Sequence, residues 1–238
     1  MSRTEEMTMI HNGRAAIYEY FTMCFHKPDD AEFIPLSKIF IKVLYDIACG
    51  SGDGMFVESA KEFSSIVEGF AGESAENVRD RINCGYTSLF LIGDRGIPVD
   101  ESVYLSPGRL TKQEPWEDLL EIYGEFGFGV PGDMHISEEH LSAELLFMSF
   151  LAEKSSFLVS ADTEADYFDI LTSQIDFMKK HIMRWVPTLC KTVMESSNRN
   201  VEFFRTASGM LYAYLLYDLR ILYEMMPESS DGGHGEAI

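Results

Sequence analysis

The sequence predicts an all-α fold, and three observations support this prediction. Apolar residues recur at three- and four-residue steps through most of the 238 residues. No segment shows the sustained alternation of apolar and polar residues that marks a half-buried strand. The glycines and prolines gather in a few short stretches, where they would separate helices. We therefore expect a single helical domain over residues 1–226.

The first half of the chain contains three apolar stripes with helical spacing. They cover residues 33–47, 56–70 and 78–90, and Gly93 would end the third. Segment 50–54 is glycine-rich like part of a phosphate loop, but it follows a helix and lacks the lysine of such loops. We interpret it as a linker that stops the first helix.

The second half predicts three further helical stripes. One begins at residues 141–151, where Ser137 could act as the N-cap and Glu138 and Glu139 would occupy the first turn. The others cover residues 168–182 and 203–223.

Two loops are expected between these stripes, at residues 93–114 and 127–137. A hinge at about 129–135 would join helical groups at about 1–128 and 136–226, and residues 227–238 would form a disordered tail. A flexible joint of this kind permits exchange of helices between two chains. We therefore expect a monomer or a domain-swapped dimer.

The charge of the chain excludes several classes of function. Its 19 Lys and Arg stand against 39 Asp and Glu, which gives a formal net charge of −20. General nucleic-acid binding needs clustered cations, and so does a basic helix lying on a membrane. No secretory signal and no apolar run of about 20 residues is present, so we expect no membrane insertion and a cytoplasmic location.

No motif for catalysis or metal binding appears. The four cysteines form no C-x-x-C pair, and no histidine lies in an H-E-x-x-H or E-x-x-H pattern. A nucleophile elbow and a complete phosphate-binding loop are also missing. We expect a binding protein with no catalytic residues, no metal and no cofactor.

Three stretches place polar and aromatic residues where a plain core would not need them. The first ends a predicted helix at 86–93, the second is the loop at 98–104, and the third opens a predicted helix at 139–148. In the third, His140 and Glu144 are four residues apart and would share one helical face. Together these stretches indicate a helical groove with polar groups at fixed positions.

At these residues the chain resembles the TorD/DmsD family, the cytoplasmic chaperones of exported molybdoenzymes. Tyr86-x-x-Leu89-Phe90-x-x-Gly93 is similar to the family's Y-x-x-L-F segment, and Pro98-x-x-Glu101-Ser102-Val103-Tyr104 is similar to its P-x-E-S-v-Y loop with one extra residue. Glu139-His140-Leu141-x-x-Glu144-Leu145-x-Phe147-Met148 resembles its D-H-L-x-x-E-L-x-F-M helix, with Glu in place of Asp. His181-Ile-Met-Arg-Trp185-Val-Pro187 resembles its H-L-x-x-W-x-P segment, and Phe203-Phe204 opens its last element.

The resemblance implies a chaperone that binds the twin-arginine signal peptide of a molybdenum-cofactor oxidoreductase. Such a chaperone delays export of the apo catalytic subunit until the cofactor is inserted. The matched motifs imply a peptide-binding site made of Tyr86, Leu89, Phe90, Pro98, Glu101, Ser102, Tyr104, Glu139, His140, Glu144, Phe147 and Met148.

Within this site we expect Glu101, Glu139 and Glu144 to receive the paired arginines while His140 orients one carboxylate. Phe90, Tyr104, Phe147 and Met148 would line a trough for the apolar part of the peptide. Two simpler interpretations stay open: core packing of each of these side chains, and a surface pair between His140 and Glu144. Two other functions also stay open: a helical nucleotide-binding protein, and an adaptor that binds the mature part of a redox enzyme through the last helix.

Overall fold

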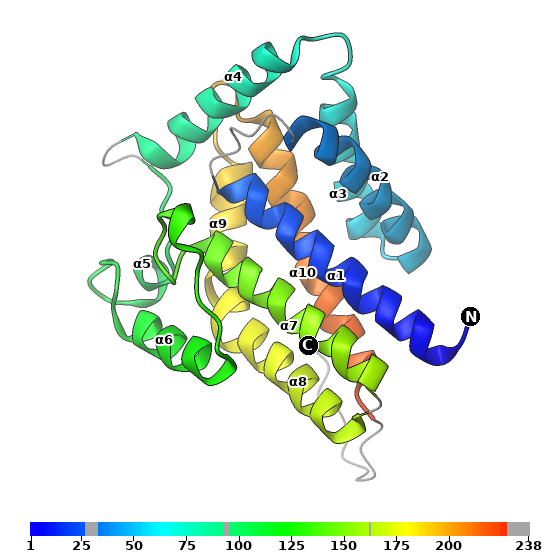
Figure 1. The fold of residues 1–238 in the computed structure, drawn as a ribbon. Helices are drawn as coiled ribbons and strands as arrows, with labels where there is room; N and C mark the ends of the chain where they lie inside the picture. The colour runs from blue at the N-terminus through cyan, green and yellow to red at the C-terminus, as the bar shows by residue number, and fades with distance from the viewer. Residues whose placement is uncertain (27–32, 93–95, 162, 228–238) are drawn as a thin grey trace.

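The structure, a computed structural model, describes residues 1–26, 33–92, 96–161 and 163–227. These residues form helices and connecting segments without a strand, which confirms the all-α prediction (Figure 1). The helices are α1 (Arg3–Phe25), α2 (Phe33–Ser51), α3 (Gly54–Glu68), α4 (Ala75–Tyr86), α5 (Glu101–Leu105), α6 (Glu114–Phe126), α7 (Leu141–Ala161), α8 (Glu164–Phe177), α9 (Met183–Met194) and α10 (Glu202–Met225). Gly93 and residues 228–238, most of the expected tail, lie outside the described ranges.

Helix α1 lies along α7, and this pair forms the middle of the bundle (Figure 1). Small residues at the contact let the two helices approach closely, and polar groups there are paired. The Thr22 hydroxyl donates to the Ser142 carbonyl at 3.3 Å, and the Ser142 hydroxyl donates to the Thr22 carbonyl at 3.2 Å. Ser149 donates to the Ala15 carbonyl at 2.9 Å. These bonds satisfy hydroxyls that would otherwise be buried without partners.

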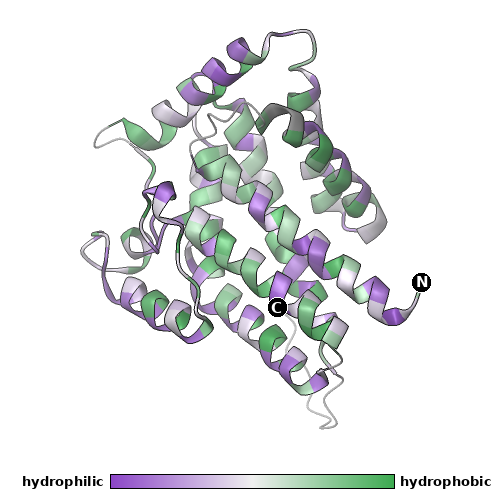
Figure 2. Ribbon diagram, viewed as in Figure 1, coloured by the Kyte–Doolittle hydropathy of each residue, from purple (hydrophilic) through white to green (hydrophobic). Residues whose placement is uncertain are grey.

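Helix α10 packs against α3 and α9, and α8 packs beside α7. In Figure 2 the central helix α7 is mostly hydrophobic in colour, whereas the outlying helix α4 is more hydrophilic. The helices α5 and α6 lie together at one side of the bundle, next to α9 (Figure 1). Among the described residues, no helix is both long enough and apolar enough to cross a membrane.

The helical pairs α1–α7 and α3–α10 each join the two halves of the chain. Between the halves, Gly132–Met134 forms a 3-10 turn. Its Met134 carbonyl accepts a hydrogen bond from the His26 ring at 2.9 Å, just beyond the end of α1. The two helical groups, the hinge at 129–135 and the exchange of helices between chains stay predictions.

The predicted helix stop at 50–54 and the predicted start of the loop at 127–137 are confirmed. The stop at segment 50–54 separates α2 from α3, where the Asp53 side chain accepts bonds from the backbone of Met55 and Phe56 at 3.0 Å. Gly127 ends α6 in the left-handed conformation, with a φ of 65°. This conformation suits glycine because it has no Cβ.

Two local predictions are wrong. Ser137 does not cap α7, which begins at Leu141, because residues 139–141 are held in an extended bridge with residues 99–101. The predicted loop at 93–114 also contains the short helix α5. Contacts distant in sequence fix both segments, so local capping and loop signals did not reveal them.

Candidate functional site

An isolated antiparallel bridge brings the second and third motif stretches together. The Glu101 N–H donates to the Glu139 carbonyl at 3.0 Å, and the Leu141 N–H donates to the Val99 carbonyl at 2.8 Å. Asp100 therefore lies opposite His140. The loop that carries α5 and the residues that open α7 therefore lie together in the folded chain.

The Glu139 side chain ties both ends of the α5 loop to the start of α7. It is fully buried, and its two carboxylate oxygens accept the backbone N–H groups of Ser102 at 3.0 Å and Lys112 at 2.6 Å. The Ser102 hydroxyl in turn accepts the Gln113 N–H at 3.1 Å. Bonds of this kind to a carboxylate are strong. We call residues 99–113 the covering loop; they include α5 and the two backbone N–H groups that bond to the buried Glu139.

Glu101 pairs with a histidine from a distant part of the chain. Its carboxylate lies 3.1 to 3.2 Å from Nδ1 of His181, and both side chains are buried. His181 belongs to the π-helical turn Met178–Ile182 between α8 and α9. Burial raises the pKa of the Glu101 carboxyl, while the hydrogen bond with His181 acts in the opposite direction.

Glu144 accepts fewer hydrogen bonds than Glu101 and Glu139 do. One of its oxygens accepts the indole N–H of Trp185 at 3.1 Å, and the other, Oε1, is buried without a hydrogen-bond partner. Burial and the neighbouring Glu101 raise the pKa of Glu144 well above its usual range. The Tyr104 ring lies 5.3 Å from the Trp185 ring, and its hydroxyl donates to the Pro98 carbonyl at 2.8 Å.

His140 is held at the start of α7 by a local bond. Its Nδ1 accepts the Ser142 N–H at 3.0 Å, and burial lowers its pKa to about 4. The interpretation of His140 and Glu144 as a surface pair is wrong, because both side chains are buried and bond to other partners. The role of His140 in orienting a carboxylate stays a prediction.

The remaining predicted site residues lie in two aromatic clusters. Tyr86 and Phe90 pack with Phe204, with ring centroids 5.9 and 5.6 Å from its ring, and the Leu89 carbonyl accepts the Ile97 N–H at 2.7 Å. Phe147 is fully buried against other rings of the core, and Met148 is fully buried as well.

The sequence prediction left out two contributors to the site, His181 and Trp185. Both were noted in a motif, and their spacing of four residues could have indicated a shared face. Their bonds to Glu101 and Glu144 show that this face turns toward the buried carboxyls. Among the residues that the structure describes, no group of three or more His, Cys, Asp or Glu could hold a metal ion.

Comparison with known proteins identifies the family. The family model for the nitrate reductase delta subunit matches residues 55–191, so the chain belongs to the nitrate reductase delta subunit family. A relative from Vibrio cholerae serotype O1 strain ATCC 39315, named Chaperone protein TorD, is 22% identical over 227 residues, which cover 94% of this chain and 99% of the relative. A protein of the same name from Vibrio parahaemolyticus serotype O3:K6 is 21% identical over 217 residues, covering 90% and 96%.

These findings confirm the resemblance to the TorD/DmsD family. The relatives are named as chaperones, which agrees with the interpretation of the chain as a binding protein instead of an enzyme.

Proposed function

We propose that this protein is a cytoplasmic chaperone that binds the twin-arginine signal peptide of a molybdenum-cofactor oxidoreductase and delays export until the cofactor is inserted. The family match and the name of the relatives support the chaperone part of this proposal. Its net charge of −20 suits a cationic partner, because opposite charge raises the rate of encounter.

The observation that carries the proposal is an imbalance of charge in the buried site. Glu101, Glu139 and Glu144 are all fully buried, and Asp100 lies beside them. The basic side chain bonded to this cluster is His181, which is charged only when protonated, while Arg184 and Lys112 lie near enough to act on the pKa values of Glu101 and Asp100 without a bond to them. Burial and the neighbouring Glu139 raise the pKa of Asp100 to about 6. A guanidinium group supplied from outside would favour the charged form of these carboxyls and pair with it.

An arginine could reach these carboxylates after the covering loop moves. Glu139 now accepts two backbone N–H groups of that loop. A guanidinium presents several N–H donors in one plane and can replace such a pair of bonds. Lysine presents a point charge and cannot match the two oxygens in the same way. The proposal therefore requires discrimination between arginine and lysine.

The test is calorimetric titration of the protein with twin-arginine signal peptides encoded near its gene, at two salt concentrations. We expect micromolar or tighter binding that weakens with salt, and at least tenfold weaker binding of a twin-lysine peptide. Glu144→Gln and His140→Ala should each weaken binding of the twin-arginine peptide. Absence of binding by the wild-type protein to every such peptide would contradict the proposal. Unchanged affinity in both variants would remove these two residues from the site.

A further inference from the structure

Glu144 differs from the other two buried glutamates because one of its oxygens has no partner. Glu139 accepts a backbone N–H on each oxygen, and Glu101 pairs with His181. Glu144 accepts the Trp185 indole N–H on Oε2, whereas its Oε1 has no hydrogen-bond partner among the residues that the structure describes. Buried polar atoms normally have a partner, so Oε1 marks a place where a donor is missing.

The surroundings of Glu144 favour the protonated carboxyl. Its side chain is fully buried, and no ammonium or guanidinium group in the described part of the chain bonds to it. An ionised carboxylate in such a place is costly, so the group takes up a proton. The neighbouring Glu101 ionises more readily, because its hydrogen bond with His181 and the charge of Arg184 both favour the charged form. Of these two carboxyls, Glu144 therefore holds the proton.

The other titratable groups that face Glu144 in the described structure supply no positive charge at neutral pH. Asp100 and Glu139 are acidic, and both raise the pKa of Glu144 further. Tyr123 of α6 is neutral, since burial raises its pKa well above the usual range. His140, one turn earlier in the chain, is also neutral, because burial lowers its pKa to about 4.

The covering loop packs over the residue that bonds to Glu144. Its helix α5 lies beside α9, and the Tyr104 ring is 5.3 Å from the ring of Trp185, which donates to Glu144. Two bonds to Glu139 tie the loop down. Movement of the loop, which the proposed function already requires, would uncover Glu139 and Glu144 together. These two acceptors match the two adjacent arginines of the peptide.

We propose that Glu144 is the acceptor for one arginine of the signal peptide and that its carboxyl proton leaves when this arginine binds. The inference rests on the proposed function and assigns a separate carboxyl to each arginine, with Glu139 as the acceptor for the other.

The step balances in atoms and charge. The O–H bond of Glu144 breaks, its electron pair stays on the carboxylate, and the proton passes to the solvent. The guanidinium donates to Oε1 and keeps its own charge, because arginine does not lose its proton in proteins. A neutral acid and a cation thus become an ion pair and one free proton. Binding should therefore tighten as pH rises, by up to about tenfold per pH unit while the unbound protein still holds the proton.

The test counts protons by calorimetric titration with the twin-arginine signal peptides encoded near the gene, at pH 7 in phosphate and in Tris buffer. These buffers differ in their enthalpy of protonation, so the difference in measured heat gives the number of protons released. We expect about one proton per bound peptide in the wild type and almost none in Glu144→Gln. Glu144→Gln should also bind at least tenfold more weakly, because an amide cannot form the ion pair.

Glu138→Gln is the matched control. Glu138 also accepts an indole N–H, from Trp116 at 2.8 Å, but it is only half-buried and this bond lowers its pKa. Its variant should release as many protons as the wild type and bind the peptide within twofold of it. Urea unfolding at pH 7 checks that both variants are folded. Glu144→Gln should keep the wild-type midpoint, because an amide resembles a neutral acid.

Infrared difference spectra of the wild type test the proposal without any variant. Addition of saturating peptide should remove a C=O band of a protonated carboxyl, and a spectrum in which no such band is lost would overturn the proposal.

The calorimetric results separate this proposal from the proposed function. If the wild type binds the peptide but releases no more protons than Glu144→Gln does, the assignment to Glu144 is overturned and the proposed function stands. If Glu144→Gln binds as tightly as the wild type, Glu144 does not accept the arginine and the assignment is again overturned. If the wild type binds no signal peptide, the proposed function fails and this assignment fails with it.

Discussion

Removal of the Asp218 carboxylate should strongly destabilise the fold. Asp218 and Arg14 are 1% and 4% exposed, and the carboxylate accepts two bonds from the guanidinium and one from Tyr18. In Asp218→Ala the Arg14 charge stays buried without its partner. Breaking a buried pair in this way costs about 3–5 kcal/mol. Burial lowers the pKa of the neighbouring His11 to about 3, so this histidine is neutral and adds no second charge.

Urea unfolding at pH 7 measures this loss as a lower midpoint with an unchanged slope. Asp176→Ala is the matched control, because Asp176 pairs with Lys180 at 2.8 Å on the surface, and such pairs contribute about 0–1 kcal/mol. A double variant with leucine at positions 14 and 218 should be more stable than Asp218→Ala, since it buries no unpaired charge. A loss below about 1 kcal/mol in Asp218→Ala would refute the assignment of a buried, mutually dependent pair.

Three further changes test other parts of the structure. Gly85→Ala should lose about 1–3 kcal/mol in thermal unfolding, because its Cβ would overlap the Asn200 carbonyl; unchanged stability would show that α4 does not pack this closely. Asp100→Asn should become more stable relative to the wild type as pH rises from about 4 to 6, by at most about 1.4 kcal/mol per pH unit. The pKa of Asp100 is higher in the folded protein than in the unfolded chain, so the free energy of unfolding of the wild type falls as the folded protein loses this proton. An equal pH dependence of the free energy of unfolding in this variant and in the wild type would contradict this. Glu139→Gln should lower the free energy of unfolding by about 1–3 kcal/mol and speed hydrogen exchange in the covering loop, because an amide offers one oxygen to two backbone donors. Exchange as slow as in the wild type would show that the bonds from Glu139 do not hold this loop in place.

The site was predictable as a set of motifs but not as a set of contacts. The family patterns placed Glu101, Glu139 and Glu144 in one site, and the structure brings them together. Their partners were not predictable, because they come from other parts of the chain. Ser102 lies 37 residues from Glu139, and Glu101 lies 80 residues from His181. Local spacing contains no information about such pairs.

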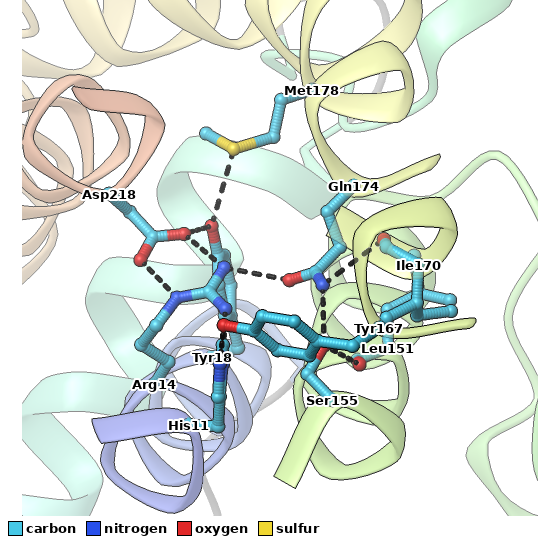
Figure 3. A network of polar contacts seen from close by, with 10 residues as sticks. All are labelled: His11, Arg14, Tyr18, Leu151, Ser155, Tyr167, Ile170, Gln174, Met178 and Asp218. Atoms are coloured by element: carbon cyan, nitrogen blue, oxygen red, sulfur yellow. Dashed lines mark hydrogen bonds and ion pairs between the residues drawn. The ribbon is translucent and has the colours of Figure 1, made fainter. Parts of the chain in front are cut away.

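The buried network of Arg14, Tyr18, Gln174 and Asp218 (Figure 3) was also absent from the sequence prediction. Helix α1 has its buried residues between His11 and Phe25 and shows no simple apolar stripe, since it carries His11 and Arg14 on its buried side. Charged residues are normally assigned to the surface. Arg14 can be buried because Asp218, 204 residues away, meets it in the folded chain.

The sequence by itself determined the helical class, the acidic character and several helix ends, because periodicity, charge and cap residues act over a few neighbouring positions. Only the tertiary structure decided which polar groups are buried and which partners satisfy them. These depend on how α1, α7 and α10 pack together. The free energy of a buried charge such as Asp218 is set by the atoms around it in space and not by its neighbours in sequence.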